Sequence, residues 1–114
     1  MQGKQVCREL PPKECNRLFT EEKETPCTIL DVRTAEEFHR GHLAGAENID
    51  FYRPDFSQCI EKKDRTCRYV VYCRRGVRGH KTMDLMRECG FIDVTNISGG
   101  FENWISQGLP VERP

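Results

Sequence analysis

The sequence contains no long hydrophobic run. Its 114 residues are 37% hydrophobic and 32% charged, and no apolar stretch approaches the roughly 18 residues of a membrane-spanning helix. Residues 1–5 also lack the apolar core of a secretory signal peptide. We therefore expect a cytoplasmic protein that has no membrane partner.

The cysteines lack the spacing of a metal site. The chain has seven of them, an odd number, and none belongs to the C-x-x-C pair that is typical of a compact zinc site. Without an export signal, we expect the thiols to stay reduced. The sequence therefore predicts neither a disulfide framework nor a metal, and it gives no sign of a cofactor. The cysteines lie at positions 7, 15, 27, 59, 67, 73 and 89.

An excess of one charge is also missing, because 18 basic residues balance 18 acidic ones. A nucleic-acid-binding domain more often carries a basic excess over its whole length, so we expect no nucleic-acid partner. The balance is uneven along the chain, since residues 65–81 contain no acid and a third of the basic residues. Such a local cationic patch suits a small anionic substrate. Its members are Arg65, Arg68, Arg74, Arg75, Arg78 and Lys81.

The length suits one domain, which we place at residues 1–114 with a core from about 5 to 111. Short apolar runs predict strands near Val6 and at 27–32, 46–49, 69–73 and 94–97. Helical patterns separate these strands. The alternation predicts βαβ units and an α/β fold, with a mostly parallel sheet that helices cover on both faces.

Start and stop signals delimit the predicted helices. Thr34 and Glu37 have the spacing of a capping box and begin a short helix that ends by Gly41. The other helices are predicted to begin at Pro11-Pro12, at Pro54, near Gly79 and after Gly99-Gly100. Their apolar faces include Cys15, Leu18, Phe19, Phe56, Cys59, Ile60, Met83, Met86, Phe101, Trp104 and Ile105.

The segment 70–80 carries the strongest functional signal. A buried strand ends at Cys73, a short arginine-rich loop follows, and a helical pattern begins near Gly79. Such a loop directs backbone N–H groups at the thiol, and the helix dipole adds positive potential. These surroundings favour the reactive thiolate. The sequence therefore predicts a nucleophilic cysteine that handles anions.

Four motifs, in this order along the chain, resemble the rhodanese family. They are Asp31-Val32-Arg33 running into Glu37-Phe38, the run from Gly41 to Ile49, the loop from Cys73 to Arg78, and Gly99-Gly100-Phe101 with Trp104. The resemblance extends over the chain from about residue 5. It implies a rhodanese-like domain with a five-stranded, mostly parallel sheet, and sulfur transfer through a cysteine persulfide.

This resemblance, together with the chemistry of the loop, implies roles for individual residues. Cys73 is expected to be the nucleophile, which takes sulfur from a small anionic donor such as thiosulfate and passes it to a thiol or to cyanide. Asp31 and Arg33, at the end of a neighbouring strand, are expected to support the loop. The expected substrate-binding residues are Arg74, Arg75, Gly76, Val77 and Arg78.

The loop residues have competing interpretations. Gly76 is expected to let N–H groups converge on the sulfur. We expect at least one loop arginine to face solvent or an acid instead of substrate. For Arg78, a structural role that pins the loop through backbone carbonyls or an internal acid competes with substrate binding.

Two other functions stay open. A phosphatase or arsenate reductase on the same fold would also use a loop cysteine, but a phosphate cradle needs C-x5-R spacing. Here Arg78 follows Cys73 with C-x4-R spacing, and Gly79 stands in the sixth position. The shorter loop is a better match for one sulfur atom. The second alternative is a persulfide carrier or binding module that serves a protein partner.

Overall fold

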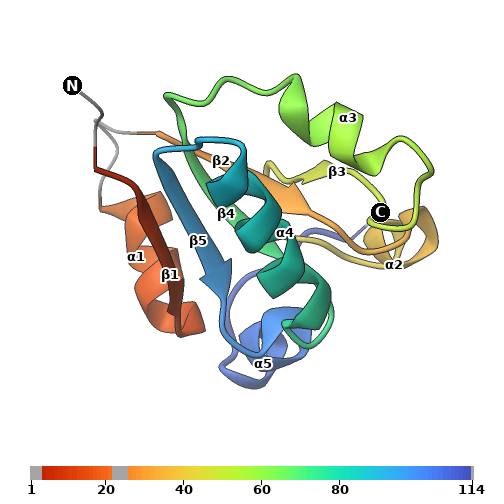
Figure 1. The fold of residues 1–114 in the computed structure, drawn as a ribbon. Coiled ribbons are helices and arrows are strands. Elements are labelled where there is room, and N and C mark those ends of the chain that lie inside the picture. Colours follow the sequence, from red (N-terminus) through yellow and green to blue (C-terminus); the bar gives the residue numbers. More distant parts are fainter. Residues whose placement is uncertain (1–3, 22–25, 114) are drawn as a thin grey trace.

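Five parallel strands form the central sheet. The structure, a computed structural model, describes residues 4–21 and 26–113. The strand order is β1-β5-β4-β2-β3, and each neighbouring pair is parallel (Figure 1). The strands are β1 (Val6–Leu10), β2 (Cys27–Asp31), β3 (Glu47–Asn48), β4 (Arg68–Tyr72) and β5 (Asp93–Ile97). The predicted α/β fold with a parallel sheet is confirmed.

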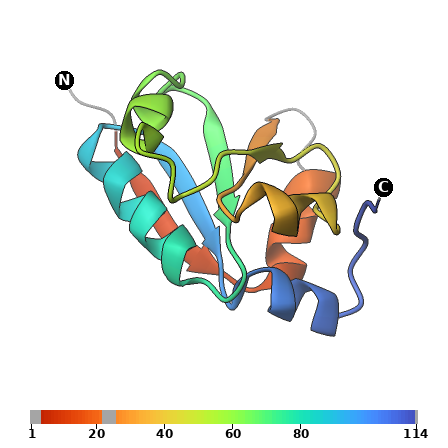
Figure 2. The same cartoon turned by 90° about the vertical axis from the view of Figure 1, so that its right-hand side faces the viewer.

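Helices cover both faces of this sheet, as Figure 2 shows. On one face, α3 and α4 pack through Phe56, Ile60, Met83 and Met86, and on the other α1 and α5 pack through a cluster that includes Trp104. Side chains of successive strand residues point to opposite faces of the sheet. Because a strand such as β4 contains a continuous apolar run, it presents apolar side chains to the helices on both faces. The helices are α1 (Pro12–Thr20), α2 (Ala35–His39), α3 (Phe56–Glu61), α4 (Val77–Glu88) and α5 (Gly100–Ser106).

Two predicted helix starts and one predicted helix face were wrong. Helix α3 begins at Phe56, not at Pro54, which lies in the preceding turn. Helix α4 begins at Val77, not near Gly79, because Gly76 caps it in a left-handed conformation with φ of +109°. Val77 and Arg78 therefore belong to the first turn of the helix. Ile105 was expected on the same apolar helix face as Phe101 and Trp104 but is 42% exposed. Helix α5 is short and packs through Phe101 and Trp104, so its next position turns toward solvent.

The parallel arrangement brings the carboxyl ends of the strands to one edge of the sheet. Central strand β4 ends beside Cys73, and the neighbouring β2 ends at Asp31, which is in register with Tyr72. On the other side of β4, β5 leads into Ser98 and Gly99. This edge is where open parallel sheets usually place their functional groups. Within the described ranges, the structure contains no helix long and apolar enough to span a membrane.

Candidate functional site

The Cys73 sulfur lies among backbone N–H groups at the start of α4. The N–H of Gly76 donates to Sγ at 3.1 Å and that of Gly79 donates at 3.2 Å. The left-handed backbone of Gly76, which glycine adopts without steric cost, turns the chain so that both groups face the sulfur. The expected convergence of N–H groups on the sulfur is confirmed. Two donors and the positive end of a 12-residue helix stabilise negative charge on this atom.

Helix α5 holds the same loop from its other side. The N–H of Phe101 donates to the carbonyl of Cys73 at 2.8 Å, and that of Glu102 donates to the carbonyl of Arg74 at 3.0 Å. Gly100 makes this approach possible, because a Cβ at this position would lie 2.5 Å from Cys73 O. Gly100 therefore lets the start of α5 pack directly against the backbone of the loop.

A cavity of about 300 Å³ opens above the thiol. Cys73 is only 1% exposed, whereas Tyr52 and Val77, which line the same cavity, are 68% and 65% exposed. The thiol is therefore recessed behind an apolar and aromatic rim, which fits a small substrate that enters end-on. The full lining is Tyr52, Cys73, Arg74, Arg75, Val77 and Arg78.

Arg74 and Arg75 share one acidic partner, Glu102. The Nε atoms of the two arginines lie 2.7 Å and 3.2 Å from its carboxylate oxygens. Hydrogen bonding from Arg74 and the charge of Arg75 hold the pKa of Glu102 below its ordinary value. The expectation that at least one loop arginine faces an acid is confirmed by both residues. Exposed pairs of this kind are weak in water, so both arginines remain available to an anion that enters the cavity.

Arg78 has an internal acidic partner, Glu37. Its Nη1 lies 3.3 Å from Glu37 Oε1, and both side chains are largely buried. Burial raises the pKa of Glu37, but the Thr34 N–H and Arg78 outweigh it and hold the pKa below its ordinary value. The same carboxylate completes the predicted capping box of α2. The structural interpretation of Arg78 is confirmed, although its guanidinium also lies 5.7 Å from the centre of the Tyr52 ring in the cavity wall.

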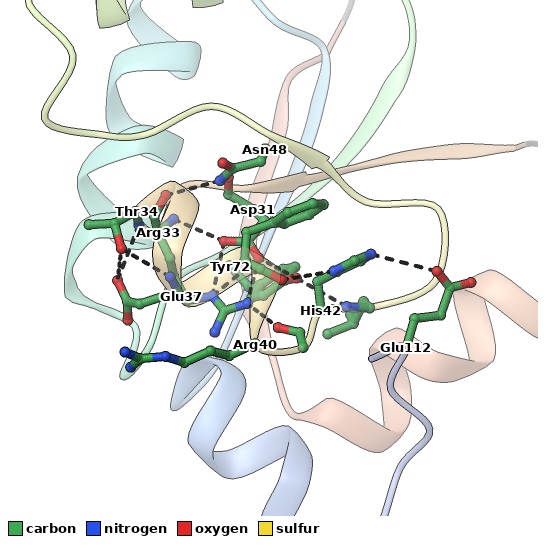
Figure 3. A network of polar contacts seen from close by, with 12 residues as sticks. Asp31, Arg33, Thr34, Glu37, Arg40, His42, Asn48, Tyr72 and Glu112 are labelled. Atoms are coloured by element: carbon green, nitrogen blue, oxygen red, sulfur yellow. Dashed lines mark hydrogen bonds and ion pairs between the residues drawn. The ribbon is translucent and has the colours of Figure 1, made fainter. Parts of the chain in front are cut away.

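Asp31 and Arg33 form a buried ion pair beside the loop (Figure 3). Arg33 Nε and Nη2 reach the Asp31 oxygens at 3.0 Å and 2.7 Å, and the Tyr72 hydroxyl donates to Asp31 Oδ2 at 2.6 Å. Burial and the adjacent carboxylate raise the pKa of Tyr72, which keeps this hydroxyl protonated. The Arg33 guanidinium also lies 4.0 Å from the centre of the Phe101 ring. Asp31 is therefore linked to Cys73 through Tyr72, the preceding residue in the chain. Arg33 is linked to it through Phe101, whose N–H donates to the carbonyl of Cys73.

His42 belongs to the rim of this network in Figure 3. Its ring stacks on Phe38 with 3.8 Å between centroids, and its Nδ1 lies 2.9 Å from the carbonyl of Phe38. Its Nε2 lies 3.6 Å from Glu112. These contacts give His42 a packing and hydrogen-bonding role next to the ion pair.

Sequence reasoning missed the roles of two residues that shape the site. Glu102 was not expected, because nothing near it in sequence marks an acid that faces a loop 27 positions away. The role of Glu37 toward Arg78 was hidden by its clear local role as a helix cap. Among the described residues, no group of three His, Cys, Asp or Glu side chains is placed to hold a metal ion.

The chain is similar to known proteins over most of its length. The Rhodanese-like domain model matches residues 12–107. "Thiosulfate sulfurtransferase 16, chloroplastic" of Arabidopsis thaliana is 33% identical over 93 residues, which cover 73% of this chain and 78% of the relative. "Thiosulfate sulfurtransferase GlpE" of Shewanella oneidensis is 32% identical over 76 residues, which cover 67% and 73%.

Other relatives are longer, and solved structures share the fold. The chain spans only 56–62% of the length of three further curated relatives that are 29–35% identical. The crystal structure of a rhodanese-related protein from Thermoplasma volcanium superposes with a TM-score of 0.80 at 24% identity, and covers 92% of this chain and 97% of its own. The family match spans most of the residues that carry the sheet, the Cys73 loop and α5, so this chain belongs to the rhodanese-like domain family.

Proposed function

We propose that this chain is a sulfurtransferase that moves a sulfane sulfur atom by way of a persulfide on Cys73. The observation that carries the proposal is the position of the thiol: a recessed sulfur, held by two N–H groups, at a cavity lined by three arginines. The names of two relatives, both thiosulfate sulfurtransferases, support the same reaction class.

The first half of the reaction uses the Cys73 thiolate as nucleophile. Its Sγ attacks the outer sulfur of thiosulfate, a new S–S bond forms, and the bond to the sulfonate sulfur breaks. Sulfite leaves with that electron pair and two negative charges, so it needs no proton from the enzyme. The product on the protein is a persulfide anion, which carries the same single charge as the original thiolate.

The second half regenerates the thiolate. An acceptor thiolate, or cyanide, attacks the terminal sulfur, the Cys73 Sγ leaves as the anion, and the acceptor departs as a persulfide or as thiocyanate. The N–H groups of Gly76 and Gly79 stabilise Sγ when it leaves, as they do before the first attack. The donor we propose is a small anion, because Arg74 and Arg75 stand at the cavity and their exposed pairing with Glu102 is easily exchanged.

The loop favours a sulfur substrate over a phosphate ester. Its N–H groups meet at one atom, Sγ, whereas a phosphate cradle must also address several oxygens around the nucleophile. Arg78, which would have to grip the oxyanion, is instead engaged by Glu37. No observation favours the phosphatase over the sulfurtransferase.

The decisive experiment is the intact mass of the protein after incubation with thiosulfate. We expect a gain of one sulfur atom that cyanide or a thiol removes. Cys73→Ser should abolish the gain and keep the fold, and Cys67→Ser is the matched control because Cys67 is an exposed thiol outside the cavity. A Cys73→Ser variant that still gains sulfur would contradict the assignment. Faster loading from a protein persulfide than from thiosulfate would identify a carrier with a protein partner.

A further inference from the structure

One buried side chain contacts both residues that present N–H groups to the Cys73 sulfur. Asn96 is fully buried on β5, and its Nδ2 donates to the carbonyl of Gly76 at 3.2 Å. Its Oδ1 packs against Gly79 so closely that a Cβ on Gly79 would collide with it. The Asn96 amide therefore contacts both residues whose N–H groups face the sulfur.

Glu9, the penultimate residue of edge strand β1, determines which way this amide points. Its Oε2 accepts a hydrogen bond from Asn96 Nδ2 at 2.9 Å and lies 2.8 Å from His80 Nδ1. These hydrogen bonds, that of Asn96 first, hold the pKa of Glu9 below its ordinary value, so the group is an anion near neutral pH. An anion accepts and does not donate, which requires Nδ2 to face Glu9 and leaves Oδ1 to face Gly79.

The cost of this orientation shows that it is imposed. Among the described residues, Asn96 Oδ1 is one of two buried side-chain oxygens or nitrogens that have no hydrogen-bond partner. A buried polar atom without a partner costs roughly 1–3 kcal/mol. A flipped amide would instead point Oδ1 at the Glu9 carboxylate and at the carbonyl of Gly76, which bring three oxygens together. In the observed orientation Asn96 Oδ1 stays unpaired, while Nδ2 donates to Glu9 and to the carbonyl of Gly76.

We propose that Asn96, oriented by Glu9, is a positioning residue for sulfur transfer. Its amide holds the carbonyl of Gly76 and packs against Gly79, which keeps the N–H groups of both glycines directed at Sγ. The proposal rests on the proposed function. Preorganised donors stabilise charge only while they hold their geometry, and small displacements of catalytic groups are costly in rate. Asn96 does not line the cavity and makes no hydrogen bond to the sulfur, so it acts through the loop.

The main test compares Asn96→Ala with Thr95→Val. Thr95 is also fully buried, adjoins Asn96 on β5, points to the opposite face of the sheet, and contacts Arg8 rather than the loop. Each variant is assayed for thermal unfolding, for the alkylation rate of Cys73 resolved by peptide mass, and for the single-turnover rate of persulfide formation against thiosulfate concentration.

We expect Asn96→Ala to lower the limiting rate of persulfide formation and the alkylation rate about tenfold, while the half-saturating thiosulfate concentration changes less than twofold. The two quantities respond differently because Arg74 and Arg75, which we expect to bind thiosulfate, are unchanged. Only the N–H groups that face Sγ lose their fixed position. Thr95→Val is expected to keep both rates within twofold even where its stability falls. Asn96→Ala with wild-type rates overturns the proposal.

A second pair of variants covers the case in which Asn96→Ala does not fold. Glu9 and His80 are partly exposed, so Glu9→Ala and His80→Ala are expected to fold. Both remove the Glu9–His80 contact, but only Glu9→Ala frees the Asn96 amide. We expect Glu9→Ala to slow Cys73 alkylation about threefold and His80→Ala to leave it unchanged; equal rates in the two variants overturn the proposal. Alkylation needs no sulfur donor, so a wild-type protein that forms no persulfide would refute the proposed function and leave this test intact.

Discussion

Replacing Arg33 with methionine is expected to destabilise the protein severely, because it strands a buried charge. Asp31 is fully shielded from solvent and accepts hydrogen bonds from the Arg33 side chain and from Tyr72. Methionine fills similar space without a charge. Removing one partner of a buried ion pair costs about 3–5 kcal/mol, because the remaining charge is left without compensation.

Two further contacts are lost with the guanidinium. Arg33 Nη2 donates to the carbonyl of Gly41 at 2.6 Å, which is worth about 1 kcal/mol. The guanidinium also lies over the Phe101 ring, which adds about 1 kcal/mol. The expected loss is therefore about 5 kcal/mol, against a total stability of about 5–15 kcal/mol for a domain of ordinary size. The midpoint of thermal unfolding should fall by about 20 °C.

The assay is urea unfolding followed by circular dichroism, for Arg33→Met, for Asp31→Asn and for the double variant. The double variant removes both charges, so we expect it to recover at least about 2 kcal/mol relative to Arg33→Met. The control is Arg40→Met, which breaks an exposed pair with Glu36 and should cost less than about 0.5 kcal/mol. A loss below about 1 kcal/mol in Arg33→Met, or a double variant no more stable than it, would refute the argument that the carboxylate is stranded.

Three further outcomes are expected. Because the pKa of Glu37 lies below its ordinary value of 4.5, its carboxylate stabilises the fold above that pH, and the advantage of wild type over Glu37→Gln in urea unfolding should vanish as the pH falls through the lowered folded value. Gly100→Ala would place a Cβ 2.5 Å from Cys73 O at φ of +63°, so it should displace the loop and lower thiosulfate turnover at least about tenfold, with the alkylation rate of Cys73 falling in parallel. One small residue inserted between Gly76 and Arg78 makes the spacing C-x5-R and should reduce sulfur transfer sharply with little gain in aryl phosphate hydrolysis; undiminished turnover with thiosulfate would show that loop length does not select the substrate.

Local patterns were sufficient to place the elements and the thiol. Short β-branched runs, capping residues and glycines act within a few residues of themselves, so the strands, the Thr34–Glu37 capping box and the position of Cys73 at the end of β4 are all legible in the sequence. The four rhodanese motifs are also local. The start of α4 was predicted two residues late because the left-handed conformation of Gly76 is visible only once the chain is folded.

Long-range pairing decided how the site works. Arg78 and Glu37 are 41 residues apart, Arg74 and Glu102 are 28 apart, and Asn96 and Glu9 are 87 apart. These pairs meet because the sheet order sets β5 between β1 and β4, and β4 beside β2, so their carboxyl ends share one edge. A sequence shows which side chains carry charge, but the acid that each base meets depends on strand order and on desolvation at that edge. The sequence by itself therefore determined the fold and the nucleophile we propose, and only the tertiary structure decided which arginines are free to meet an anion and what holds the N–H groups on the sulfur.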